Sequence, residues 1–329
     1  MKRFVACILL MLALYAFVAC SSSDNDYEAY EPEQDLTAEV TTEATTPPQT
    51  EAAQNDEIPF MWLITSPQGQ TMYIFGSIHA ATPDLWPLPQ TVMRAFARSD
   101  FLALETGGPN ATDIIHLTTL AEDQTAADFI PAELYQRALA VLEAYFPNFL
   151  GIADNLHPLM WWMLGLEYIA IDQSNIDPLF GVEVQLMFEA PHFDLELIWI
   201  EYDNHYEFME AMLNLPMELH LKMIENGLDV HLAAQNYNEL YESWRGGDGD
   251  SLYNIWWRNL TFALSDELAA ELYDVLLTHR DIRMANEASR LMAEGKNVFF
   301  SVGTMHLLGE DSIIDLLVQK GYTAERIRY

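Results

Sequence analysis

The stretch Tyr73-Ile74-Phe75-Gly76-Ser77-Ile78-His79 decides the fold, because its pattern returns near the other end of the chain as Phe300-Ser301-Val302-Gly303-Thr304-Met305-His306. Each stretch reads as an apolar strand followed by Gly, a hydroxyl residue, an apolar residue and His. Glycine has no Cβ and so permits a tight turn where the strand ends. A loop and an amphipathic helix follow each stretch, and this order predicts an α/β fold.

Strand patterns occur on both sides of a long helical middle. They are predicted at 60–66, 71–75, 101–104, 195–200, 298–302 and 324–329. The turn residues at 67–69 make the first two strands a hairpin. Residues 111–292 have mostly helical periodicity, with periodic segments at 133–145, 157–170, 205–227, 229–244 and 266–293. We therefore expect an α/β domain at 58–329 with a central, mainly parallel sheet, flanking helices and a large helical insertion.

The N-terminus has the pattern of an export signal. Residues 1–20 begin with Lys2 and Arg3, continue with an apolar run too short to span a membrane, and end in Ala19-Cys20. Phe17-Val18-Ala19-Cys20 resembles a lipobox, in which Cys20 would be lipidated; the alternative is a plain cleaved signal. The prediction is a lipoprotein anchored through Cys20 to a bacterial membrane, outside the cytoplasm.

The segment that follows is strongly acidic. Residues 21–57 contain eleven Asp and Glu and no Lys or Arg, which predicts a disordered linker. The whole chain has 50 acidic and 15 basic residues and a formal charge of −35. This charge argues against nucleic acid as a partner. The only cysteines are Cys7 and Cys20, so the domain has no disulfide, thiol nucleophile or thiolate metal site.

Three polar residues are predicted at one edge of the sheet. His79 and His306 follow strands in the repeated pattern, and Glu105 ends the strand at 101–104. Ligands of open α/β sheets bind at the carboxyl edge. Two imidazoles and a carboxylate are a common ligand set for a catalytic divalent metal. Alternatively, the histidines bond loops and Glu105 pairs with an arginine. For a metal site, we expect both imidazoles to face solvent.

The chain resembles the TraB/GumN family, which includes the Tiki-type membrane-tethered metalloproteases. The similarity extends in order over about 60–329 and lies in five segments: 76–79, 87–105, 181–183, 280–285 and 303–323. It implies site roles for His79, Glu105, Arg280 and His306, with Glu183 as a further candidate. The chain departs from the family at Asp281, where Asn is more usual, and after Glu201, where Asp203, His205 and Tyr206 stand in place of an expected Gln.

Two functions fit these residues. The first is a cell-surface metal-dependent hydrolase that cleaves peptides or proteins, with the metal held by His79 and His306. Glu105 is then either the third ligand or the general base, and Arg280 either stabilises an oxyanion or forms a salt bridge with Glu105 or Glu183. The second is a surface protein that sequesters a peptide or signal molecule without turnover. The sequence leaves the metal's identity open.

Overall fold

The computed structural model describes residues 60–105, 111–201 and 205–328, and it contains every predicted strand. The predicted signal peptide, the lipidation site Cys20 and the linker at 21–57 lie outside the described residues. Among those residues, no helix combines the length and the apolar character needed to cross a membrane.

The central sheet has six strands in the order β4-β3-β5-β2-β1-β6. They are β1 (Met61–Thr65), β2 (Thr71–Ser77), β3 (Phe101–Leu104), β4 (Glu196–Trp199), β5 (Val298–Gly303) and β6 (Thr323–Arg326). The pairs β4–β3, β3–β5 and β5–β2 are parallel, whereas the β1–β2 hairpin and the β1–β6 pair are antiparallel. The carboxyl ends of β2, β3, β4 and β5 therefore meet at one edge, as predicted.

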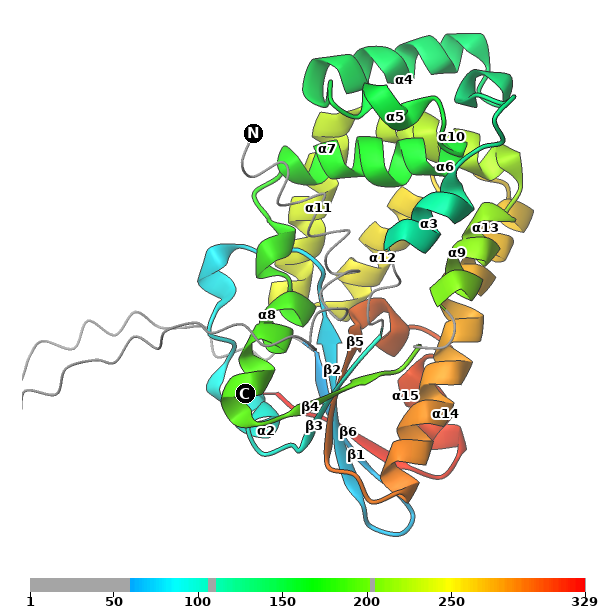
Figure 1. The fold of residues 1–329 in the computed structure, drawn as a ribbon. Helices are drawn as coiled ribbons and strands as arrows, with labels where there is room; N and C mark the ends of the chain where they lie inside the picture. Colours follow the sequence, from blue (N-terminus) through cyan, green and yellow to red (C-terminus); the bar gives the residue numbers. More distant parts are fainter. Residues whose placement is uncertain (1–59, 106–110, 202–204, 329) are drawn as a thin grey trace, which may run out of the picture.

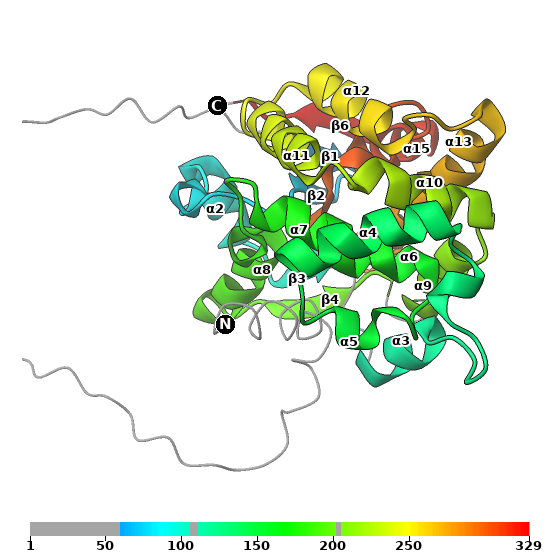
Figure 2. The same cartoon turned by 90° about the horizontal axis from the view of Figure 1, so that it is seen from above.

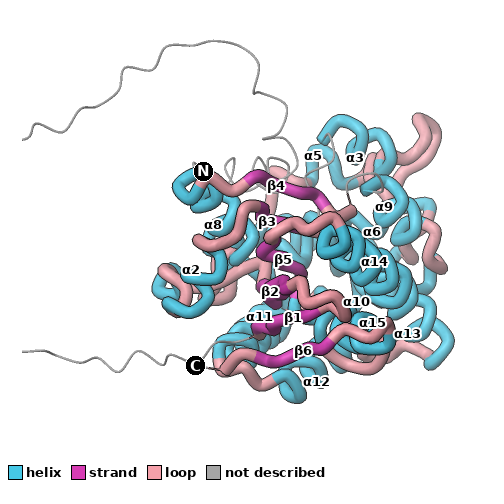
Figure 3. The backbone as a smooth tube through the Cα atoms, turned by 90° about the horizontal axis from the view of Figure 1, so that it is seen from below, coloured by secondary structure: helices cyan, strands magenta, loops and turns pink. Residues whose placement is uncertain are grey.

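Helices cover both faces of the sheet. One face carries α2 (Gln90–Phe96) and α8 (Val182–Glu189); the other carries α14 (His279–Ala293) and α15 (Ile313–Gln319) (Figures 1 and 3). The remaining helices form a lobe above the carboxyl edge, best separated in Figure 2. They are α3 (Ala111–Thr118), α4 (Ala132–Tyr145), α5 (Leu150–Ala153), α6 (Pro158–Met160), α7 (Glu167–Asp172), α9 (His205–Leu213), α10 (Met217–Gly227), α11 (Val230–Arg245), α12 (Gly249–Leu260) and α13 (Asp266–Tyr273).

The periodic segment at 205–227 forms two helices. α9 ends at Leu213, and α10 begins at Met217 after Pro216. Proline has no N–H to donate and its ring clashes with the preceding turn, so a helix does not continue through it. Two π-helical turns interrupt the other long helices, at Trp161–Leu166 and at Asp274–Thr278. The second one leads directly into α14.

The described residues bury two hydrophobic clusters. The first surrounds the sheet and includes Phe75 and Phe299; the second lies within the helical lobe and includes Trp161 and Leu219. α11 belongs to both, because Val230 at its start is buried in the lobe whereas Trp244 near its end is buried against the sheet. This helix therefore joins the insertion to the sheet.

Candidate active site

The carboxyl edge of the sheet brings the three predicted residues together. A Cβ built on Gly303 would lie 3.0 Å from Oε1 of Glu105, 3.6 Å from Cδ2 of His306 and 3.9 Å from Nε2 of His79. The three side chains thus meet around one backbone position at the end of β5. Nε2 of His306 is 3.8 Å from Oε1 of Glu105.

The two Gly-x-x-His turns are bonded to each other. Oγ1 of Thr304 donates to the carbonyl of Ser77 at 2.8 Å, and Nε1 of Trp244 on α11 donates to Oγ1 of Thr304 at 2.9 Å and to the carbonyl of Gly76 at 3.0 Å. A Cβ on Gly76 would lie 2.7 Å from the Thr304 hydroxyl. Glycine is therefore needed at 76 for this close approach.

A carboxylate holds each imidazole by Nδ1. Nδ1 of His306 is 2.5 Å from Oδ1 of Asp281 on α14, and Nδ1 of His79 is 2.9 Å from Oε1 of Glu183 on α8. Because Nδ1 of each ring is bonded to a carboxylate, Nε2 is the nitrogen of each ring that remains for the region around Gly303. In metal sites, ligating histidines are typically oriented by carboxylates in this way.

The first turn of α8 is fixed against the His79 loop. The N–H of Val182 donates to the carbonyl of Ile78 at 2.9 Å, and the hydroxyl of Ser77 donates to Oε1 of Glu183. A Cβ on Gly181 would lie 2.2 Å from the carbonyl oxygen of His79, so this contact requires glycine. The sequence pattern Gly181-Val182-Glu183 thus corresponds to a docking turn that positions a carboxylate.

Arg280 joins two buried carboxylates. Its Nη2 donates to Glu105 at 2.9 Å and to Glu201 at 3.0 Å, and its Nε donates to Oε1 of Glu201 at 3.0 Å. Nη1 donates to the carbonyl of Leu276 at 3.3 Å, and the ring of Phe208 lies 4.8 Å from the guanidinium carbon. Of the two salt-bridge partners considered from the sequence, Arg280 contacts Glu105 and not Glu183.

The electrostatics keep Glu105 ionised. Burial raises the pKa of this carboxyl, but His306, Arg280 and His79 together with the Gly303 N–H outweigh that effect and hold the pKa at about 2. The Glu183 carboxylate raises the pKa of His79 despite opposing desolvation. Since 77% of the His79 side chain is exposed, solvent weakens this attraction.

The expectation that both imidazoles face solvent is wrong for His306. Its side chain is 5% exposed, because it lies under the carboxyl edge against Asp281. No group of three or more His, Cys, Asp or Glu side chains among the described residues is arranged to hold a metal ion. The donors are near one another but not within ligating distance of a common point.

Sequence reasoning missed two participants. Glu201 follows β4 much as Glu105 follows β3, and the Glu201 N–H donates to the carbonyl of Glu105 at 2.9 Å. The position of Glu201 just after a predicted strand was the available signal. Asp281 was noticed only as a departure from the family pattern, although its neighbour Arg280 was a candidate. Asp203 lies outside the described residues, and the side chains of His205 and Tyr206 are not described.

Comparisons with known proteins identify a family and several similar proteins. The family model described as TraB/PrgY/gumN matches residues 60–326. The protein YbaP of Escherichia coli K12 is 23% identical over 258 residues, covering 77% of this chain and 90% of YbaP. Metalloprotease TIKI1 of Danio rerio is 24% identical over 324 residues, covering 84% of this chain and 65% of that protein. Metalloprotease TIKI2 of Xenopus tropicalis is also 24% identical, with 60% of its length covered. No solved structure matches.

Proposed function

The chain belongs to the TraB/PrgY/gumN family, and from that premise we propose that it is a metal-dependent hydrolase of peptides or proteins. One observation carries the proposal: two imidazoles, each held at Nδ1 by a carboxylate, leave two Nε2 atoms beside the ionised Glu105. The relatives named metalloproteases support it. Because the chain covers less than two thirds of those relatives, their activity is here a proposal.

The donor chemistry fits a divalent metal. Nε2 of His79, Nε2 of His306 and Oε1 of Glu105 would hold the ion, which would polarise a substrate carbonyl and acidify a bound water. Asp281 and Glu183 orient the two rings from outside this set and increase their basicity. Several divalent ions suit such ligands.

The environment of Glu105 favours a ligand over a general base. Its oxygens accept from the Gly303 N–H and from Arg280, and its pKa of about 2 lies far below neutrality. A general base is most effective when its pKa is near the working pH. Glu105 therefore contributes a fixed negative charge to the site.

The contacts of Arg280 favour a positioning role over oxyanion stabilisation. Nε, Nη1 and Nη2 all donate to protein acceptors, among them the two carboxylates that it neutralises. Desolvation lowers the pKa of Arg280, but the attraction of Glu105 and Glu201 raises it by a larger amount, so the guanidinium stays charged. It holds Glu105 in place at the end of β3.

The test measures metal content and cleavage separately. The purified chain is loaded with zinc, dialysed, assayed for bound metal, and incubated with a peptide library with and without chelator. We expect His79→Ala and His306→Ala each to lose metal affinity by more than the roughly 10- to 100-fold that removal of an outer partner costs. His192→Ala, an exposed histidine outside the site, serves as control.

A second candidate function is sequestration of a peptide or signal molecule without turnover. The observation that favours it is the absence, among the described residues, of a preassembled group of three metal ligands. This function predicts that the library is bound but not cleaved and that chelator has no effect. Cleavage that chelator abolishes and zinc restores would exclude it.

We also propose that the protein acts outside the cytoplasm, anchored to a bacterial membrane by lipid on Cys20, with no nucleic-acid partner. The apolar run that ends at Cys20 and the acidic 21–57 segment support this placement. Cys20→Ser is expected to move the protein out of the membrane fraction or block its processing. Retention in the membrane at unchanged size would contradict the proposal.

A further inference from the structure

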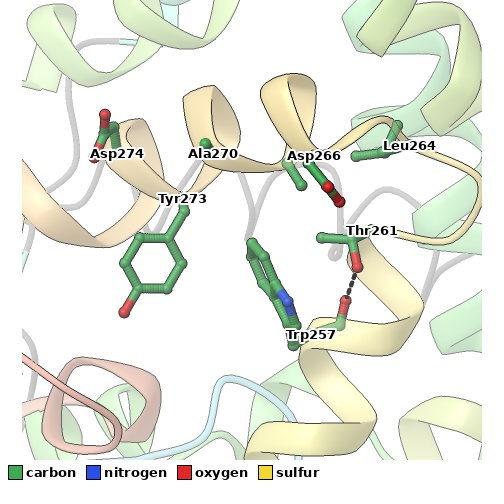
Figure 4. A pocket seen from close by; sticks show the side chains of 8 residues that line it. Trp257, Thr261, Leu264, Asp266, Ala270, Tyr273 and Asp274 are labelled. Atoms are coloured by element: carbon green, nitrogen blue, oxygen red, sulfur yellow. Dashed lines mark hydrogen bonds between the residues drawn. The ribbon is translucent and has the colours of Figure 1, made fainter.

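A second recess lies between α12 and α13, apart from the histidines. It has a volume of about 460 Å³. Figure 4 shows Trp257 and Tyr273 side by side below α13, with Asp266 and Thr261 at one end and Asp274 at the other. The two aromatic rings meet edge to face, with centroids 5.3 Å apart and an interplanar angle of 88°. Thr261 bonds the carbonyl of Trp257 at 2.7 Å and so fixes the end of α12.

The charged residues that line this pocket are all negative. Asp266 and Asp274 line it, and no Lys, Arg or His does. Neither carboxylate forms an ion pair with another residue in the part of the chain that the structure describes. The small side chains of Ala269 and Ala270 leave room between them.

We propose that this pocket binds the guanidinium or ammonium group of a basic side chain on an extended polypeptide. A cation over an aromatic ring is attracted by the ring's quadrupole, most strongly over Trp. Carboxylates complete the recognition by charge-assisted hydrogen bonds. Asp266 and Asp274 are eight residues apart, about 12 Å along a helix, so one bound cation hydrogen-bonds one of these carboxylates while the other adds longer-range attraction.

The pocket is physically connected to the candidate site. α13 continues through the π-helical turn Asp274–Thr278 into α14, which carries Arg280 and Asp281 at its start. Asp281 lies close enough to Tyr273 to contribute to the raised pKa of that phenol, after burial and Tyr253. A side chain bound here would hold its polypeptide next to the site. The inference therefore rests on the proposed function and names its substrate class: polypeptides with a basic residue.

The test uses two matched peptides and no metal. Acetyl-Gly-Arg-Gly-Gly-amide is compared with the same peptide containing citrulline, which has the shape of arginine without its charge. Binding to the full chain is measured by calorimetry in the presence of chelator. We expect the arginine peptide to bind about 10-fold more tightly than the citrulline peptide, and this preference to shrink as salt rises.

Variants locate the binding. Asp266→Asn, Asp274→Asn and Trp257→Phe should each reduce the preference for arginine, whereas Glu271→Gln, which removes an exposed acid of α13 outside the pocket, should not. Equal binding of both peptides, or an equal loss in the Glu271→Gln variant, would overturn the proposal. Because this test involves neither metal nor cleavage, arginine-selective binding here combined with no cleavage in the separate zinc-loaded assay would contradict the proposed function alone.

Discussion

At the residue scale, the two histidines differ in how firmly they are held. His306 is buried and its Nδ1 lies 2.5 Å from Asp281, whereas His79 is exposed and depends on Glu183 at 2.9 Å. Loss of the His306 hydrogen bond should cost more free energy than loss of the His79 bond, because a buried polar group that loses its partner cannot regain one from water. Asp281 is therefore the outer residue on which the site depends most.

Replacement of Asp281 tests this dependence. Asp281→Ala leaves Nδ1 of His306 without an acceptor and should weaken zinc binding about 10- to 100-fold, with a loss of about 1–3 kcal/mol in the free energy of unfolding. Asp281→Asn keeps an amide oxygen for the same hydrogen bond and should retain most of the affinity. Zinc titration and urea unfolding measure both effects. Equal losses for the two variants would show that charge, and not orientation, matters.

The two turn glycines predict different defects. In Gly303→Ala the new methyl would lie 3.0 Å from Oε1 of Glu105, which must shift by only a few tenths of an ångström, so the variant should stay folded and lose zinc affinity. In Gly76→Ala the methyl would meet the Thr304 hydroxyl at 2.7 Å and Cβ of Phe60 at 2.8 Å, and overpacking should reduce stability by about 1–3 kcal/mol. Thermal unfolding and zinc titration of both separate these outcomes; matching defects would contradict the reasoning.

At the scale of elements, the strands were predictable and the lobe less so. Apart from the polar β6, each strand is a short, mostly apolar run ended by Gly, Pro or charged residues, and this pattern can be recognised without knowledge of the tertiary structure. The parallel arrangement then placed His79, Glu105 and His306 at one edge. The breaks within the periodic helical segments were not predicted, because the periodicity continues through Pro216 and the π-helical turns.

The partners of the site residues could not be predicted from spacing. Asp281 is adjacent to Arg280 in sequence, yet it faces His306 from α14 while Arg280 faces Glu105 and Glu201. Which acid meets which base depends on how α8 and α14 dock on opposite faces of the sheet. That docking is determined by three-dimensional packing, which a one-dimensional pattern does not contain.

Two helices of the lobe contain a histidine pair that predicts acid sensitivity. His157 at the start of α6 and His220 on α10 have ring centroids 5.0 Å apart. Nδ1 of His157 accepts from the N–H of Leu159, which requires a neutral ring, and Nε2 of His220 donates to the carbonyl of Met212. Nδ1 of His220 is buried without a hydrogen-bond partner among the described residues. Neither ring has a site ready for a second proton.

The direction of the pH effect follows from these positions. Burial and then His220 lower the pKa of His157 to about 4, and burial lowers the pKa of His220. In the unfolded chain both titrate near 6.5, so that state binds more protons between these values, and the free energy of unfolding falls as pH falls from about 6.5 toward 4. The loss from His157 is at most about 3 kcal/mol.

Urea unfolding at several pH values checks this prediction. His220→Phe removes one titrating ring and should flatten the fall in stability below about pH 6.5 relative to the unmodified chain. His192→Gln, at an exposed position, should leave the fall unchanged. An identical pH dependence in all three proteins would mean that the buried pair does not cause the acid sensitivity.

At the scale of the whole molecule, α11 connects the two hydrophobic clusters, because it contributes buried residues to both. Its first turn is buried in the lobe through Val230, and its last turn is buried against the sheet through Trp244. Tyr241 adds a contact to the loop after His79, with its hydroxyl 2.6 Å from that of Thr82. The lobe and the site should therefore respond together to changes at this helix.

Trp244→Phe tests this coupling, because it removes the indole N–H and leaves a smaller ring in a fully buried position. Nε1 of Trp244 is the donor that links α11 to Gly76 and Thr304, so its loss leaves two buried acceptors without that donor and should reduce stability by about 1–3 kcal/mol. Because both Gly-x-x-His turns depend on Thr304, zinc affinity should fall as well. Calorimetry should show a broader or split unfolding transition compared with the unmodified chain, as the lobe and the sheet unfold less cooperatively.

The matched control is the same substitution in the other cluster. Nε1 of Trp161 donates to the carbonyl of Ala153 at 2.8 Å, entirely within the lobe. Trp161→Phe should therefore reduce stability by a similar amount while zinc affinity is unchanged. If both variants alter zinc affinity equally, general destabilisation explains the effect. If only Trp244→Phe alters it, the hydrogen bonds at the end of α11 hold the two histidine turns in register.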